Sequence, residues 1–128
     1  MPFLLDTNVA IHLRDGDPGI KGKIAGLTDD VFLSIITRVE LEGGVLAEQA
    51  LAPYRRARLD TMFALIRVVD FDEGCADAYR AIVERAGYSR RKVMDRMIAA
   101  QALAHSASLV TMNARDFRDV AGLTLLEW

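Results

Sequence analysis

The chain has 128 residues, which is enough to bury most of its apolar surface in one core, and we expect a single domain over residues 1–128. Its 52% hydrophobic and 27% charged residues exclude a disordered protein, and its apolar runs are shorter than the ~18 residues of a membrane-spanning helix. A net charge of −2 excludes a uniformly basic surface, and the lone Cys75, expected to be buried, excludes an internal disulfide and agrees with a cytoplasmic location.

Five short apolar runs are typical of buried β-strands, and helical patterns separate most of them. This alternation predicts an α/β fold with a parallel sheet covered by helices on both faces. The predicted strands, in chain order, are Phe3–Leu5, Val31–Ile35, Arg67–Phe71, Leu109–Thr111 and Leu123–Leu126.

Capping, proline and glycine residues place the helices between these strands. Asp17 is a helix N-cap followed by proline at the first helical position, and Gly87 is a helix stop. The predicted helices follow Asp6 and Asp17-Pro18, run near Arg38–Glu48 and from Pro53 to Ile66, and cover Glu73–Ala86 and Lys92–Ala107.

Two of the predicted strands each deliver an aspartate into a polar turn. Asp6 follows Phe3–Leu5, and Asp116 follows Leu109–Thr111. The carboxyl ends of parallel strands share one edge of the sheet, where such folds bind their ligands, so we expect both acids there. Each acid also has a purely structural explanation, since Asp6 could cap the next helix and Asp116 could bond to its own turn. Asp119 is a competitor for the place of Asp116.

Two further acids lie on predicted helices. Asp95 shares a helical stripe with Ile98 and Ala99, and an unpaired carboxylate on such an apolar stripe is costly, which favours a functional role. Glu40 lies on the glycine and alanine side of its helix, whereas Glu42 lies nearer the bulky apolar residues. Small residues leave room for a site, so Glu40 is preferred.

Carboxylates gathered in one pocket raise one another's pKa and need a cation to stay ionised. Mg²⁺ suits such a pocket, because it takes oxygen ligands, keeps several waters and can activate water for phosphodiester hydrolysis. Zinc is disfavoured, because His12 and His105 are far apart in the sequence and Cys75 has no partner. A metal-free acid–base pair of the two histidines is a less favoured alternative.

Basic side chains gather in the middle of the chain. Residues 1–48 carry four basic and eight acidic side chains, whereas residues 49–96 carry ten basic and seven acidic. Basic runs bind phosphates in some proteins and are ordinary solvated helix faces in others, and both alternatives stay open. The side chains expected to contact phosphates are Arg55, Arg56, Arg58, Arg90, Arg91 and Lys92.

Four short blocks of the sequence resemble PIN-domain ribonucleases, and above all the VapC-type toxins of toxin–antitoxin pairs. They occur in the order of that family and near its spacing, over nearly the whole chain. The blocks are Leu5-Asp6-Thr7-Asn8, Ser34-Ile35-Ile36-Thr37 with Glu40-Leu41, Asp95 with Ile98-Ala99-Ala100, and Thr111-Met112-Asn113 with Asp116-Phe117.

The resemblance implies a three-layer α/β/α PIN domain with a five-stranded parallel sheet in the order 3-2-1-4-5. It also implies a homodimer and a cognate VapB-like antitoxin that blocks the pocket. It assigns metal-binding catalytic roles to Asp6, Glu40, Asp95 and Asp116, and supporting polar roles to Thr7, Asn8, Thr111 and Asn113.

These observations together predict a Mg²⁺-dependent endoribonuclease, with Mn²⁺ as a substitute, acting as the toxin of a toxin–antitoxin pair. The four acids would hold one or two ions directly or through water. A metal-activated water would attack the phosphorus and leave a 5′-phosphate and a 3′-hydroxyl, so no side-chain nucleophile is needed.

Three other protein classes compete with this prediction. A non-catalytic RNA- or protein-binding module of the same fold is the main alternative. A HAD-like phosphatase needs a second aspartate two residues after the first, and this chain has Asn8 there. A receiver domain needs adjacent acids after its first strand and a lysine after a late strand, but no lysine follows Lys92.

Overall fold

A computed structural model describes residues 1–128, and a parallel five-stranded sheet runs through its middle. The strand order is β3-β2-β1-β4-β5, which confirms the order predicted from the resemblance. Each neighbouring pair is parallel. The strands are β1 (Phe3–Leu5), β2 (Val31–Ser34), β3 (Val68–Val69), β4 (Ser108–Thr111) and β5 (Leu125–Glu127).

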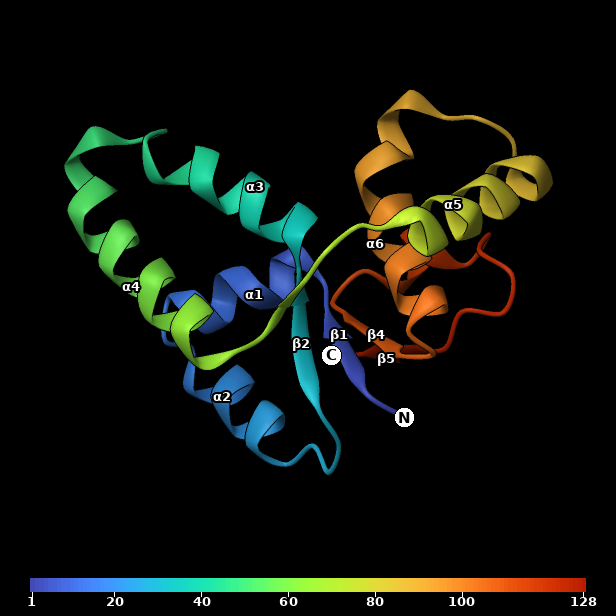
Figure 1. Ribbon diagram of the computed structural model, residues 1–128. Coiled ribbons are helices and arrows are strands. Elements are labelled where there is room, and N and C mark those ends of the chain that lie inside the picture. Colours follow the sequence, from blue (N-terminus) through green and yellow to red (C-terminus); the bar gives the residue numbers. More distant parts are fainter.

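Helices cover both faces of the sheet, which makes three layers. In Figure 1, helices α1 to α4 lie on one side of the strands, and α5 and α6 lie on the other. No helix has the length and apolar character needed to cross a membrane. The α-helices are α1 (Thr7–Arg14), α2 (Pro18–Ala25), α3 (Ile35–Val45), α4 (Ala52–Leu65), α5 (Glu73–Ala86) and α6 (Val93–Ala104). Three short 3₁₀ segments are η1 (Gln49–Leu51), η2 (Arg90–Lys92) and η3 (Ala114–Phe117).

The central strands are apolar on both faces because each face packs against helices. Leu4 belongs to a buried cluster that includes residues of α5 and α6, while Leu5 belongs to a second cluster with residues of α1, α2 and α4. Phe32 and Leu33 repeat this alternation on β2. Successive side chains of a strand point to opposite faces, so a strand covered on both sides shows a continuous apolar run.

Several element boundaries differ from the prediction. The second strand ends at Ser34 and α3 begins at Ile35, because the Ser34 hydroxyl caps the helix by accepting from the Ile36 N–H at 2.9 Å. Helix α3 ends at Val45, before the predicted end at Glu48. The predicted strand at 67–71 forms only the two-residue β3, and the one predicted at 123–126 forms later, at 125–127. The predicted helix 92–107 is α6, which ends at Ala104, since Ser106 has a left-handed backbone with φ of 51°.

A fully buried glutamine on α6 links that helix to the sheet and to α3. The Gln101 amide oxygen on α6 accepts from the Ser34 hydroxyl, and its amide nitrogen donates to the carbonyls of Val69 and Asp70, each at 3.1 Å. Burying an amide without partners would be costly, and here both of its polar atoms are paired. This contact ties α6 to the start of α3 and to the end of β3.

Candidate active site

The candidate site lies where the strand order changes direction. From β1 the chain moves through β2 to β3 on one side and then returns to β4 on the other. The Asp6 N–H donates to the Val110 carbonyl at 2.8 Å, which fixes the end of β1 beside the end of β4. In open α/β sheets the carboxyl edge at such a switch point forms a crevice, and ligands bind there.

Asp6 is both the N-cap of α1 and a buried acid of the crevice. Its side chain is held by two donors, the Thr7 backbone N–H and the Thr111 hydroxyl, each at 2.8 Å. Burial raises the pKa of Asp6, the two hydrogen bonds oppose that rise, and the charges of Glu40 and Asp116 add to it. Asp6 therefore caps α1 and lines the crevice at the same time, so its role as a cap does not exclude a role in the site.

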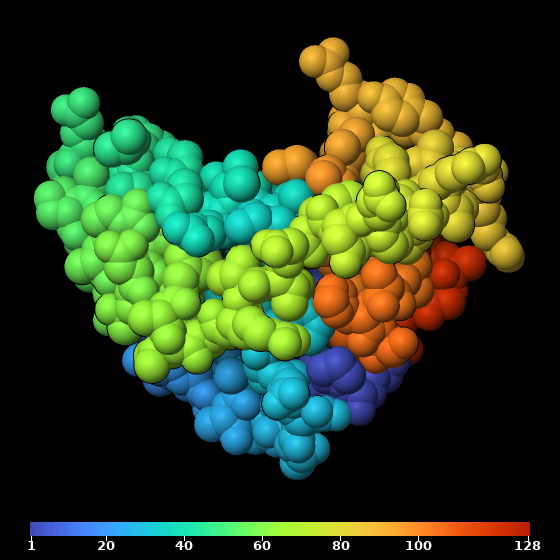
Figure 2. Space-filling view, in the orientation of Figure 1, coloured from blue at the N-terminus to red at the C-terminus, as the bar shows by residue number.

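Glu40 and Asp95 enter the site from opposite sides. Glu40, on α3, accepts a hydrogen bond from the Thr7 hydroxyl at 3.0 Å. Desolvation raises the pKa of Glu40, and the charge of Asp95 adds to the effect. Asp95 lies in the first turn of α6, where burial raises its pKa, as do the charges of Asp6 and Asp116. Figure 2 shows a broad notch between the end of α3, in teal, and the segment around η2, in amber.

The fourth acid comes from the turn after β4. Asp116, in η3, accepts a hydrogen bond from the Asn113 amide and lines the same cavity as the other three acids. Its competitor Asp119 is outside that cavity and is paired with Lys92 and Arg96, each at 3.0 Å. Those cations hold the pKa of Asp119 below its usual range. The geometry thus favours Asp116 as the fourth acid.

The four acids share a cavity of about 230 Å³ that no Lys, Arg or His side chain lines. A liquid water occupies ≈ 30 Å³, so this space has room for an ion together with several waters. Three of the carboxyl groups have a raised pKa for a common cause, burial, and neighbouring carboxylates contribute to each. Ionising all of them without a cation is therefore unfavourable.

The chemistry of the donor set fits a hard divalent cation. All four charged groups present oxygen, which Mg²⁺ and Mn²⁺ bind in preference to softer ligands. No group of three His, Cys, Asp or Glu side chains is placed to hold an ion directly. An ion held by fewer direct contacts would reach the remaining carboxylates through its waters, which is the usual manner of Mg²⁺.

The supporting polar residues fall into two groups. Thr7, Asn8 and Asn113 line the cavity. Thr111 is fully buried behind it, where its hydroxyl donates to Asp6 and accepts from the Asn113 N–H at 3.0 Å. Thr37 belongs to one of the four resembling blocks, but the sequence analysis assigned it no supporting role. The buried Thr37 lies 3.0 Å from the Thr7 hydroxyl, and because that hydroxyl donates to Glu40, Thr37 is its donor. Its spacing of three residues before Glu40 on one helix was the available indication.

The six predicted basic residues do not form one continuous basic surface. Arg56 is occupied by Glu42 and Asp60, and Arg58 bonds to Tyr54 and to the Asp15 carbonyl. Lys92 pairs with Asp119. Arg90 and Arg91 are exposed on η2. Arg55 alone among the six lines a groove that adjoins the acids. Phosphate contact by any of them stays a prediction.

Glu40→Gln is expected to lower RNA cleavage by about 10–100-fold, the range seen when a carboxylate that supports a metal site is lost. Glu42→Gln, two residues away, is expected to cleave at close to the wild-type rate, because Glu42 faces Arg56 and Arg38 outside the cavity. Initial rates measured on one RNA at saturating Mg²⁺ compare the two variants. Equal losses would show that the choice of helix face is wrong.

The family model of the PIN domain matches residues 3–123 of the chain. The chain belongs to the PIN domain family. This PIN domain is 32% identical over 133 aligned residues to the tRNA(fMet)-specific endonuclease VapC of Salmonella typhimurium, with 100% of this chain and 98% of that protein covered. It is 26% identical over 134 aligned residues to Ribonuclease VapC2 of Rickettsia felis, with the same coverage.

Solved structures agree with these relatives. The PIN domain here superposes on VapBC2 from Rickettsia felis bound to a DNA fragment from the promoter with a TM-score of 0.88 at 25% identity, covering 100% of this chain and 99% of that one. The match to FitAcB from Neisseria gonorrhoeae has a TM-score of 0.83 at 29% identity, covering 98% and 96%. The chain is thus a VapC-like PIN ribonuclease of the toxin–antitoxin kind, a family whose cleavage depends on metal.

Proposed function

We propose that this VapC-like ribonuclease is an endoribonuclease that uses Mg²⁺, with Mn²⁺ as a substitute. The observation that supports it is the cavity in which four carboxylates from separate elements meet without a basic side chain. In this proposal Asp6, Glu40, Asp95 and Asp116 hold the cation directly or through water. A divalent cation bound there would supply the positive charge that activates a water and stabilises the leaving oxygen.

The residues of the chain prepare this site before substrate arrives. Thr7 and Thr111 fix both carboxylate oxygens of Asp6, and the Thr7 hydroxyl fixes Glu40. Asn113 holds Asp116 in the same way. Side chains already held in one rotamer lose little freedom when they bind, which favours a precise geometry around the scissile phosphate. Cleavage on this scheme leaves a 5′-phosphate and a 3′-hydroxyl.

The partners follow from the same assignment. We propose that residues 1–128 act as one domain in the cytoplasm, as a homodimer, and that a VapB-like antitoxin encoded nearby covers the acid cavity. The solved relatives described as VapBC assemblies support the antitoxin. Because the Salmonella relative is named a tRNA(fMet)-specific endonuclease, initiator transfer RNA is the first substrate to test.

Removing metal tests the mechanism. Purified protein is expected to cleave a folded RNA such as initiator transfer RNA with Mg²⁺, to stop in EDTA, and to recover when excess Mg²⁺ or Mn²⁺ is added. The reason is that the ionised acids alone repel the substrate phosphate. Gel analysis of the products and of their ends provides the measurement, and undiminished cleavage in EDTA would rule out the metal-dependent mechanism.

A further inference from the structure

A groove runs from the acid cavity toward α4. It shares Thr7, Ile11 and Glu40 with the cavity, and its other end is lined by Arg14 of α1 and Arg55 of α4. Arg14 was not among the residues singled out by the sequence analysis. A ligand seated among the acids therefore has a continuous path to two guanidinium groups.

The spacing along α1 explains how Arg14 reaches this groove. Thr7, Ile11 and Arg14 stand at positions i, i+4 and i+7, so they share one face of the helix. A rise of 1.5 Å per residue places Arg14 about 10 Å beyond Thr7 along the helix axis. A nucleic-acid strand carries a phosphate at every nucleotide, spaced by only a few ångströms of rise. A strand with one phosphate at the acids would therefore carry others past Arg14.

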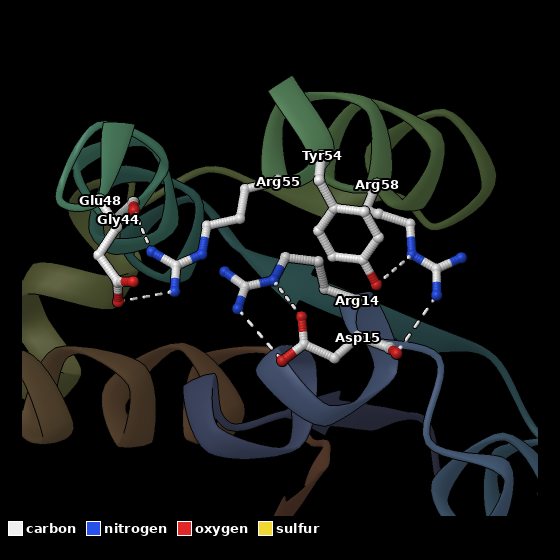
Figure 3. Close-up of polar contacts among 7 residues, drawn as sticks. All are labelled: Arg14, Asp15, Gly44, Glu48, Tyr54, Arg55 and Arg58. Atoms are coloured by element: carbon white, nitrogen blue, oxygen red, sulfur yellow. Dashed lines mark hydrogen bonds and ion pairs between the residues drawn. The ribbon is translucent and has the colours of Figure 1, made fainter. Parts of the chain in front are cut away.

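Both guanidinium groups are already held in place. Arg14, which is 8% exposed, donates from Nε and Nη2 to the Asp15 carboxylate at 3.0 and 3.4 Å. Arg55 donates from Nη1 to the Gly44 carbonyl at 3.0 Å, and one of its nitrogens lies 3.4 Å from Glu48. Figure 3 shows the two side chains extending from α1 and α4 into the same space. Because these cations are already fixed, they lose little conformational entropy when they bind an anion.

Arg14 and Arg55 keep hydrogen-bond donors that an anion could use. In the Arg55–Glu48 pair the carboxylate is 64% exposed, and an ion pair at such exposure contributes little. Asp15 lines the groove beside Arg14 and offsets part of its charge, but each arginine has further N–H donors beyond the contacts described. The acid cavity next to them repels any polyanion, so a strand that enters it needs compensating cations close by.

We propose that Arg14 and Arg55 form a binding subsite for a backbone phosphate of the RNA, beside the phosphate that is cleaved. The inference rests on the proposed ribonuclease function, and it assigns one end of the substrate to the α1–α4 side of the acids. A repeating polyanion fits the observations better than an acidic peptide, because the same ligand must span both the carboxylate cavity and the arginines.

Arg58 is a positioning residue for this subsite. Its Nη2 donates to the Asp15 carbonyl at 3.2 Å, and so it anchors the end of α1 against α4. Gly16 makes that contact accessible, since its φ is 81° and a Cβ there would lie 2.4 Å from Arg58 Nη2. Two arginines of this run therefore differ in role: Arg55 faces the groove, while Arg58 holds the backbone that carries Arg14.

A charge test uses a short RNA oligonucleotide with one mapped cleavage site. Arg55→Gln is expected to raise KM about tenfold with kcat little changed, because a charged hydrogen bond formed equally in ground and transition states is lost. Arg55→Lys should recover part of the affinity. The matched control is Arg80→Gln, which removes an exposed charge paired with Glu84 on α5 and should behave as wild type. Arg14→Gln is studied beside Arg14→Lys, with thermal melting to confirm folding.

Neutral methylphosphonate linkages identify the phosphate concerned. Replacing the phosphates one at a time should reveal one linkage, outside the cleaved one, whose neutralisation weakens binding to wild type. The same replacement should have no added effect in Arg55→Gln, since the pair is already broken. Binding in Mg²⁺ of an oligonucleotide whose cleaved linkage is a methylphosphonate, followed by fluorescence anisotropy, should show a salt slope reduced by about 0.7 in this variant.

A steric test leaves the charges unchanged. A Cβ at Gly43 or Gly44 meets no atom within 4 Å, but only Gly44 lines the groove. Gly44→Leu should therefore weaken RNA binding, whereas Gly43→Leu, one residue away on α3, should not.

Three outcomes would contradict this inference, and they differ in whether the proposed ribonuclease function survives. If wild type cleaves the RNA and Arg55→Gln and Gly44→Leu match their controls, the subsite is wrong while the ribonuclease stands. If wild type neither binds nor cleaves RNA, both are overturned. Variants that keep RNA affinity but lose the antitoxin would assign the groove to a protein partner and reject the subsite.

Discussion

Asp6→Asn is expected to reduce RNA cleavage by more than about 100-fold, beyond the range for losing a residue that only supports a metal ligand. The variant should fold, because the amide oxygen still accepts from the Thr7 N–H and the amide nitrogen can donate to the Thr111 hydroxyl, whose proton turns away. Cleavage rates at saturating Mg²⁺, beside circular dichroism spectra, measure both properties. A rate near that of wild type would mean that Asp6 is only a helix cap.

The same variant should be more stable than wild type without metal, and this gain depends on pH. The pKa of Asp6 is raised in the folded protein, so its ionisation at neutral pH destabilises the fold. The increase in the free energy of unfolding caused by Asp6→Asn is therefore largest at a pH above the folded pKa of Asp6. It falls as the pH drops through that value and is lost below the unfolded value near 3.8, where the wild-type carboxyl is protonated in both states. Thermal melting in EDTA at pH 7 and at pH 4 tests the sign.

Expression of the wild-type chain alone is expected to arrest growth of a bacterial host, and co-expression of the small gene adjacent to it should restore growth. The physical basis is the carboxylate cavity, where a basic side chain of an antitoxin could pair with acids that otherwise repel and so replace the cation. Optical density after induction, with protein levels checked by blotting, gives the measurement.

Two matched variants make the growth result specific. Asp6→Asn should be harmless at equal expression, while Arg80→Gln, altered far from the cavity on α5, should be as toxic as wild type. Unimpaired growth despite soluble wild-type protein that cleaves RNA in vitro would reject the toxin role and leave the nuclease standing.

Sequence patterns predicted the sheet and the gathering of the acids because both depend on short-range rules. Buried parallel strands are continuous apolar runs, and Asp6 and Asp116 follow two of them. Asp95 could be recognised because a charge on an apolar helical stripe is conspicuous. The catalytic roles of these residues stay predictions.

The roles of the basic residues were harder to predict from the sequence, because they depend on packing between helices. Arg55 and Arg56 are adjacent in the sequence, but Arg56 meets Glu42 of α3 and Arg55 meets the Gly44 carbonyl. Arg14 lies in no basic run, and only the packing of α1 beside α4 brings it to Arg55. A local sequence window contains neither contact.

The buried contact between Ser34 and Gln101 sets how far the two walls of the notch stand apart. Ser34 begins the helix that carries Glu40, and Gln101 belongs to the helix that carries Asp95. Spreading those helices would strip two fully buried polar groups of their partners, which is more costly than the bond itself is worth. We therefore expect the distance between α3 and α6 to change little when RNA or an inhibitor binds in the notch.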